Sequence, residues 1–255
     1  MPGTLKMPNP SISKLEDTSK VLRQKIVAYS HYAKIPHLAS CLSVVDILTC
    51  LYFQHARVNS KTPHDPDRDR IVLSKGHGAP ALFQVLAMAG YFPEDWLFRP
   101  DHGGGLFGEH PPTPSHLPGI EAATGSLGHG LPMAVGMALS ARIKGQNFNS
   151  YAVVGDGECN EGSIWEAAML ASAQQLSNLT VIVDYNKWQA TGRSDEILNL
   201  TPLAQKFSAF GFNTFEIDGH CISSIIDSLL DNENSNAPKC IIAHTVKGKG
   251  VSFME

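Results

Sequence analysis

Glycine, carboxylate and amide residues directly follow two short apolar runs near the middle of the chain. Gly155, Asp156 and Gly157 come after the valine-rich run at 151–154, and Asn186 comes after the run at 179–184. Short apolar runs with such boundaries are typical of buried strands. A carboxylate and an amide oxygen brought together suit Mg²⁺, which prefers oxygen ligands and usually completes its shell with phosphate and water. These residues therefore predict a divalent-cation site beside a phosphorylated ligand.

The stretch between the two runs determines whether these residues can meet. Residues 161–176 carry apolar or small side chains at helical spacing, among them Ile164, Ala168 and Leu176. Two parallel strands joined by a helix lie close together in one sheet, with their carboxyl ends at the same edge. We therefore expect Asp156 and Asn186 to lie close together. The glycines allow close approach of a phosphate, and the following helix offers free N–H groups to it.

The rest of the chain predicts the same alternation of strands and helices. We expect strands at 71–73, 213–217 and 240–245, and helices at 15–33, 42–53, 79–89, 131–143, 202–210 and 221–230. Repeated βα units predict an α/β fold with a mostly parallel sheet and helices on both faces. Residues 1–9 and the Gly-, Pro- and His-rich stretch 101–118 predict irregular structure. We expect residues 1–255 to form one domain.

Composition bounds the class of protein. The chain has 255 residues, of which 43% are hydrophobic and 17% charged, as expected for a globular enzyme with a large core. A net charge of −4 gives no indication of a nucleic-acid or anionic membrane partner. No apolar run approaches the length of a membrane span. Five cysteines without CxxC spacing predict reduced thiols and a cytoplasmic location.

The GDG turn, the helix and the asparagine after the next strand together resemble the thiamine-diphosphate motif, and most closely that of the transketolase family. The resemblance implies a thiamine-diphosphate-binding fold, in particular the domain that binds the diphosphate. It implies two cofactors, thiamine diphosphate and Mg²⁺ or another divalent cation. The metal ligands would be the side chains of Asp156 and Asn186 and the backbone carbonyl of Trp188. Gly155, Gly157 and Glu158 would belong to the cofactor site, with Gly157 contacting the diphosphate.

Further stretches resemble motifs of the same family. His37, in IPHLASCLSVVDIL, matches a histidine that touches substrate. His77, in VLSKGHG, matches a histidine that contacts the cofactor diphosphate. Lys247, in KGKG, belongs to a turn that closes over the diphosphate. The run ATGSLGHG matches a segment whose backbone lines the thiamine, through Gly125, Ser126 and Leu127.

A third histidine is expected to face substrate, and three are candidates. His110, in EHP, has the best local match to the family's GHP loop, but extra residues separate it from Pro118 and Gly119. His102 and His116 are competitors for the role. An imidazole suits it because it exchanges protons near neutral pH and hydrogen-bonds hydroxyl or phosphate oxygens. We assign His110 as catalytic together with His37, and leave the two competitors open.

The resemblance implies transfer of a two-carbon ketol unit from a ketose, or ketose phosphate, to an aldose or aldose phosphate. In this family the cofactor is activated by a glutamate that lies in a second, pyrimidine-binding domain. This sequence ends at Glu255, soon after the KGKG turn, and we expect the pyrimidine-binding domain to lie on a separate chain. We therefore expect the amino-terminal subunit of a split transketolase. Its partner would be a carboxy-terminal subunit that carries the pyrimidine-binding domain, in an α2β2 heterotetramer.

Other interpretations remain open at this point. The chain also resembles 1-deoxy-xylulose-phosphate synthase and the E1 subunits of 2-oxo-acid dehydrogenases, although its PGIEAATGSLGHG and KGKG runs match split transketolases more closely. A non-catalytic scaffold subunit is a further alternative, against which the joint presence of His37, His77, Asp156 and Asn186 argues. A fragment of a longer enzyme is another. The sequence does not identify the donor or acceptor sugar.

Overall fold

A computed structural model describes residues 10–99, 107–231 and 236–255. The prediction of irregular structure for residues 1–9 falls outside these ranges, and so does the candidate His102. For the stretch 101–118, the described part from residue 107 onward contains turns and bends without a regular element, as predicted.

The centre of the molecule is a five-stranded sheet in the order β1-β2-β3-β5-β4, in which every neighbouring pair is parallel. Gly155, at the end of β2, pairs in register with Asp184 on β3. The residues after both strands therefore start from the same edge, which confirms the parallel arrangement predicted from the βα alternation. The strand bounds are β1 Arg70–Leu73, β2 Ser150–Gly155, β3 Leu179–Tyr185, β4 Asn213–Asp218 and β5 Lys239–His244.

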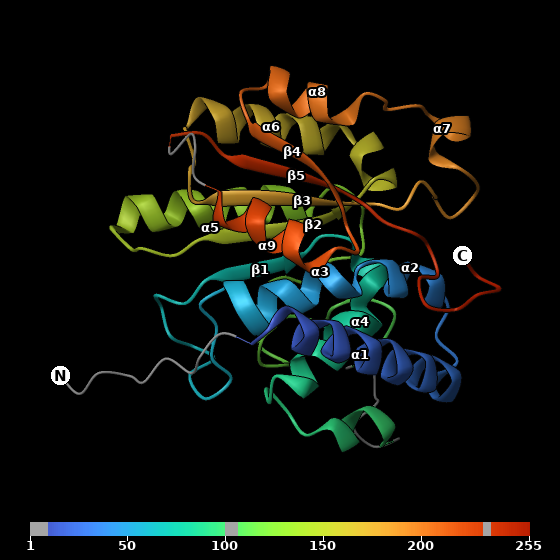
Figure 1. Cartoon of the computed structure of the whole chain (residues 1–255). Helices are drawn as coiled ribbons and strands as arrows, with labels where there is room; N and C mark the ends of the chain where they lie inside the picture. Colours follow the sequence, from blue (N-terminus) through green and yellow to red (C-terminus); the bar gives the residue numbers. More distant parts are fainter. Residues whose placement is uncertain (1–9, 100–106, 232–235) are drawn as a thin grey trace.

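Helices cover both faces of the sheet (Figure 1). Alternate strand residues point to opposite faces, so Tyr151 and Val153 join one apolar core while Ala152 and Val154 join the other. The first core is completed by α1 Ile12–Ala33, α2 Leu38–Ser43, α3 Val45–Cys50, α4 Ala79–Met88 and α9 Ile222–Leu230. The second is completed by α5 Gly130–Lys144, α6 Gly162–Ala173 and α8 Leu203–Ala209.

The prediction of one helix at 42–53 was wrong. The segment is divided into α2, α3 and a π-helical turn at Leu51–His55, with the first break at Val44. Ser43, the last residue of α2, donates its hydroxyl to Asp184 of β3 at 2.7 Å. The same hydroxyl also lies 3.1 Å from the Ser40 carbonyl of α2, so Ser43 connects the end of this helix to the sheet. Val44 and Val45 add the poor helix propensity of β-branched residues at the break.

Smaller differences occur around the GDG turn and beyond it. A 3-10 turn at Gly157–Asn160 precedes α6, which ends at Ala173, so the helix is shorter than the predicted 161–176. Three further short elements were not predicted: the 3-10 helices Gly76–Gly78 and Glu94–Phe98, and α7 Ser194–Ile197. Elements of three to five residues leave almost no periodicity in a sequence.

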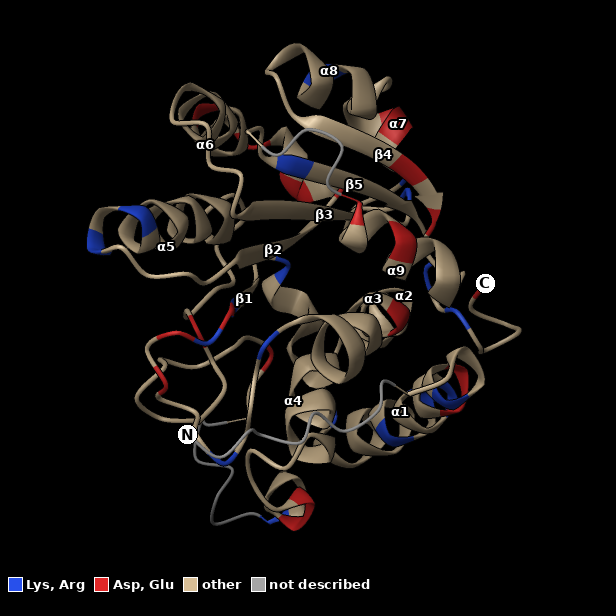
Figure 2. Cartoon of the chain, turned by 60° about the vertical axis from the view of Figure 1, so that its left-hand side comes forward, with Lys and Arg blue, Asp and Glu red and all other residues tan. Residues whose placement is uncertain are grey.

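Charged residues are distributed over many elements, and α1 carries both signs (Figure 2). This agrees with the small net charge of −4. Among the helices of the described residues, none has the length and apolar character needed to span a bilayer.

Candidate functional site

A cavity of about 450 Å³ lies at the carboxyl edge of the sheet. Its walls come from the turns that follow β1, β2, β3 and β5 and from the start of α2. Segments far apart in the sequence therefore meet in one place. Ten of the residues predicted from the sequence line it: His37, His77, Leu127, Gly155, Asp156, Gly157, Glu158, Asn186, Trp188 and Lys247.

Asp156 is a buried carboxylate in this cavity, with an exposed fraction of only 3%. Burial raises its pKa to about 6, and the nearby charge of Asp184 acts in the same direction, although a hydrogen bond from Ser194 and the charge of Lys75 oppose the shift. The Ser194 hydroxyl donates to Oδ2 at 2.7 Å. A buried carboxylate with this shift is incompletely neutralised by the chain itself, which is the situation that a bound cation relieves.

Asn186 and Trp188 form a tight turn beside Asp156. The Asn186 Oδ1 accepts the backbone N–H of Trp188 at 3.0 Å, and its Nδ2 donates to the Ser43 hydroxyl at 3.3 Å. These bonds fix the amide with its oxygen facing the turn. Across residues 10–99, 107–231 and 236–255, no three His, Cys, Asp or Glu side chains are grouped to hold a metal ion. A metal in this cavity would therefore depend on Asp156 with amide, carbonyl and ligand oxygens, a donor set that fits Mg²⁺.

A buried ion pair between Lys75 and Asp184 lies beneath the cavity. Lys75 also donates to the Ser40 carbonyl at 2.9 Å, and Asp184 accepts the hydroxyls of Ser43 and Thr245. The network joins α2, β3 and the end of β5, and it places a cation next to an expected anion site. This network was not predicted from the sequence, in which the position of Lys75 two residues before His77 was the available signal.

Three histidines stand in series at the cavity. The ring centroids of His37 and His77 are 4.6 Å apart, and those of His77 and His110 are also 4.6 Å apart. Burial and the neighbouring rings of His110 and His37 lower the pKa of His77, which favours the neutral ring. Two or more imidazoles in edge contact can pass or share protons with a substrate hydroxyl.

The structure places His110, and not His116, beside the cavity. The ring of His110 packs against His77 and lies close to Gly125, where an added Cβ would be 2.8 Å from its Cδ2. The side chain of His116 is exposed, and no described contact joins it to the cavity residues. His102 lies outside the described residues.

Glu158 holds three loops together. Its Oε1 accepts the Ser74 hydroxyl at 2.5 Å and the Gly128 N–H at 2.9 Å, and its Oε2 accepts the Gly155 N–H at 3.2 Å. These bonds connect the turn after β1, the TGSLGHG run and the GDG turn. Although Glu158 lines the cavity, its carboxylate is engaged by the protein, so it orders the site more directly than it offers a ligand contact.

The same loops meet backbone to backbone at two glycines. An added Cβ at Gly76 would lie 2.6 Å from both Cα and N of Gly125. Gly125 itself has a φ of 149°, which disfavours other residues. Of the predicted ATGSLGHG residues, Leu127 lines the cavity, Gly125 lies behind it against His110, and Ser126 is exposed and does not line it.

Lys247 and Gln189 close the cavity on the side of the KGKG turn. The Lys247 ammonium donates to the Gln189 carbonyl at 3.2 Å and lies 5.6 Å from the centre of the Trp188 ring. Burial lowers the pKa of Lys247. The Gln189 side chain lies over Gly157, and its buried Nε2 has no partner among the described residues. An unpaired amide and a half-buried ammonium beside a glycine turn fit an anionic group such as a diphosphate.

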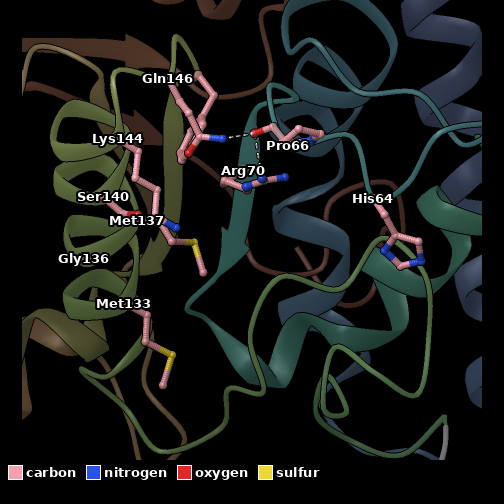
Figure 3. Close-up of a pocket in the computed structure, with 10 residues that line it drawn as sticks. His64, Pro66, Arg70, Met133, Gly136, Met137, Ser140, Lys144 and Gln146 are labelled. Carbon is pink, nitrogen blue, oxygen red and sulfur yellow. Dashed lines mark hydrogen bonds between the residues drawn. The ribbon is translucent and has the colours of Figure 1, made fainter.

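A second hollow lies at the opposite edge of the sheet, between α5 and the start of β1 (Figure 3). Its lining includes Arg70, Met137 and Lys144, and none of the residues predicted for the site. Arg70 is already used there, because it donates to the Pro66 carbonyl at 3.0 Å and stacks over Phe148. The predicted residues therefore converge on the carboxyl edge and not on this hollow.

Comparison with known proteins agrees with the fold. The model of the family described as transketolase, thiamine diphosphate binding domain, matches residues 14–255. The chain therefore belongs to the transketolase family, where it corresponds to the domain that binds thiamine diphosphate. It is 43% identical to an apulose-4-phosphate transketolase subunit of Actinobacillus succinogenes over 97% of this chain and 90% of that protein. It is 39% identical to the 6-deoxy-6-sulfo-D-fructose transketolase subunit SqwG of Clostridium sp. over 94% and 88%.

Complete transketolases match over part of their length. The chain is 35% identical to the transketolase of Pongo abelii, and the match covers 100% of this chain but 40% of that one. The crystal structure of Campylobacter jejuni transketolase superposes with a TM-score of 0.88 at 31% identity, over 94% of this chain and 39% of that one. The chain is thus an amino-terminal transketolase subunit by sequence and fold, and its class of enzyme is that of transferases.

Proposed function

We propose that this chain provides the diphosphate-binding half of a split transketolase, which moves a two-carbon ketol unit from a ketose to an aldose. The observation that carries the proposal is the cavity at the carboxyl edge, where residues predicted from separate sequence motifs come together. When bound there, thiamine diphosphate would supply the carbanion chemistry that breaks the donor's carbon–carbon bond. The chain's own residues would bind and orient it and move protons.

The cofactor roles divide between the two sides of the cavity. We assign Asp156, Asn186 and the Trp188 carbonyl to Mg²⁺, because they supply oxygen atoms around a buried carboxylate. We assign Gly155 and Gly157, with the ammonium of Lys247, to the diphosphate. The backbone of Gly125, Ser126 and Leu127 would line the thiamine, and Glu158 would keep these loops in register through its three hydrogen bonds.

The histidine series provides the proton-transfer groups. His77 is favoured in its neutral form by its surroundings, so it can accept or donate a hydrogen bond at neutral pH. We propose that His37 and His110, on either side of it, face the sugar hydroxyls and exchange protons with them.

A partner chain completes the enzyme in this proposal. The chain matches about 40% of a full transketolase, and two of its relatives are designated subunits. We propose a carboxy-terminal subunit with a pyrimidine-binding domain as the partner, in an α2β2 heterotetramer with the cofactor between subunits. The five cysteines are all free thiols, which supports a reducing, cytoplasmic setting.

The relatives suggest the chemical class of the donor. The protein from Actinobacillus succinogenes is named for apulose-4-phosphate and that from Clostridium sp. for 6-deoxy-6-sulfo-D-fructose. Both compounds are sugars with an anionic group at the end remote from the transferred carbons. We propose a ketose of this kind, a phosphate or a sulfonate, as the donor for the present enzyme.

Reconstitution tests the function. Tagged chain is used to capture its partner from native lysate, and ketol transfer is measured for the chain, the partner and the complex, with Mg²⁺ and thiamine diphosphate or with EDTA. We expect turnover only in the complex with both cofactors, on the order of 100-fold or more above either chain. Full turnover by the isolated pure chain would refute the half-site proposal. A complex that binds thiamine diphosphate yet transfers no ketol unit from any ketose tested would refute the transferase assignment.

The assignment of His110 has its own test. Replacing His110 by alanine should lower kcat by about 100-fold and change the affinity for thiamine diphosphate by less than about threefold. The cofactor affinity should change little because the His110 ring packs against His77 and not against the residues assigned to the metal. His116→Ala serves as the matched control, since this exposed side chain lies in the same loop. If His116→Ala or His102→Ala lowers kcat instead, the loop assignment is wrong.

A further inference from the structure

A buried polar cluster stands behind the KGKG turn and outside the cofactor cavity. Asp46 of α3 accepts two hydrogen bonds from the Arg23 guanidinium, at 3.2 and 2.5 Å. Asp46 also lies 2.8 Å from Nδ1 of His220, which follows β4. Burial would raise the pKa of Asp46, but the bonds from His220 and Arg23 outweigh it and the pKa is lowered. Asp46 is therefore an ionised acceptor that fixes both partners.

The contacts of His220 define its tautomer. Its Nε2 lies 2.9 Å from the backbone nitrogen of Val246, which can only donate, so Nε2 accepts. Its Nδ1 faces the Asp46 carboxylate and therefore carries the proton. A neutral imidazole thus connects a buried carboxylate to the backbone of the residue immediately before Lys247.

Arg23 of the same polar cluster lies against Gly250, at the far end of the KGKG turn. Gly250 has a φ of 93°, and an added Cβ there would lie 3.0 Å from Cδ of Arg23. Between these two points, the Gly248 N–H donates to the Ala39 carbonyl at 2.9 Å, beside the start of α2. The turn that carries Lys247 into the cavity is therefore supported at Val246 by His220 and at Gly250 by Arg23.

We propose that His220 is a positioning residue for cofactor binding, which acts by holding the Val246 amide so that Lys247 points into the cavity. Asp46 and Arg23 serve this role by fixing the His220 ring. The proposal rests on the proposed function for its consequence, which is binding of the cofactor diphosphate. The contacts themselves are independent of that function, so the turn can be tested without any ligand.

Two substitutions at His220 separate its two hydrogen bonds. His220→Asn retains a donor toward Asp46 but cannot reach Val246, whereas His220→Gln places an acceptor near the position of Nε2. Hydrogen exchange at the Val246 amide is measured in the full chain. We expect it to be about fivefold to tenfold faster in His220→Asn, since one hydrogen bond is lost, and close to wild type in His220→Gln. The matched control is His244→Ala, because His244 makes its contacts with Glu216 and Tyr185 and not with the turn.

The outcomes decide the proposal. Unchanged exchange at Val246 in His220→Asn would overturn it, and so would equally fast exchange in His220→Gln. If His220→Asn does not fold, His220→Ala, which also loses the bond to the Val246 amide, takes its place in the comparison with His220→Gln. In the reconstituted complex, the affinity for thiamine diphosphate with Mg²⁺ should fall about tenfold in His220→Asn and recover in His220→Gln. A wild-type complex that binds no thiamine diphosphate would refute the proposed function, whereas equal binding by wild type and His220→Asn would refute the positioning role.

Discussion

Replacing Asp156 by asparagine should reduce the affinity of the assembled enzyme for thiamine diphosphate in the presence of Mg²⁺ by on the order of 100-fold or more. The change keeps the shape of the side chain and removes its charge. A buried cation loses most of its stabilisation when its single carboxylate ligand becomes neutral. Isothermal titration calorimetry measures the effect, with the fluorescence of Trp188, which lines the cavity, as a second reporter.

The same substitution should leave the cofactor-free fold as stable as the wild type at neutral pH, or more stable. Because the pKa of Asp156 is raised to about 6 in the fold, its contribution to stability is fully present below its unfolded pKa and is lost as pH rises through about 6. The neutral asparagine of the variant would carry no such dependence, so the difference in stability should build up between pH 3.8 and about 6 and be complete above that range. Asp195→Asn, at an exposed position of α7, is the control for both measurements.

If Asp156→Asn binds thiamine diphosphate with Mg²⁺ as tightly as the wild type does, the assignment of Asp156 as a metal ligand is wrong.

The sheet was predictable because its strands are short apolar runs that end in recognisable turn residues. The run 151–154 and the run 179–184 became β2 and β3 with one or two residues added, and their parallel pairing followed from the helix between them. That pairing is what makes Asp156 and Asn186 neighbours, so the centre of the site followed from local patterns and one topological rule.

Contacts that depend on side-chain reach were not predictable in the same way. Ser194 donates to Asp156 from α7, an element too short to leave a periodic signal. Lys75 and Asp184 pair beneath the cavity, and nothing in either local sequence indicates the other. Ser43, at the end of α2 where the predicted helix at 42–53 is broken, also binds Asp184 across the core. These side-chain contacts join residues that are far apart in the sequence, and a single sequence does not show which of its polar residues pair.

The contact between two glycines combines a feature that the sequence predicts with one that it does not. Gly76 and Gly125 were both within recognised motifs, but only the structure shows that they touch. Replacing Gly76 by alanine should destabilise the fold by about 3 kcal/mol and weaken cofactor binding at least tenfold, since the new Cβ would meet backbone atoms of Gly125 at 2.6 Å. Backbone atoms cannot rotate away as a side chain can, so the two loops must separate, and His77 and His110 would move with them.

Gly136 provides the matched control for that prediction. It lies within α5, its φ is not positive, and an added Cβ there would meet nothing within 4 Å. Gly136→Ala should therefore stabilise the protein by about 0.5–1 kcal/mol through its helix propensity. Chemical denaturation of both variants measures the free energy of unfolding, which should fall in Gly76→Ala and rise in Gly136→Ala. A Gly76→Ala variant as stable as Gly136→Ala would show that the loops can part at little cost, and the tight packing would then have no role in holding the histidine series against the cofactor turn.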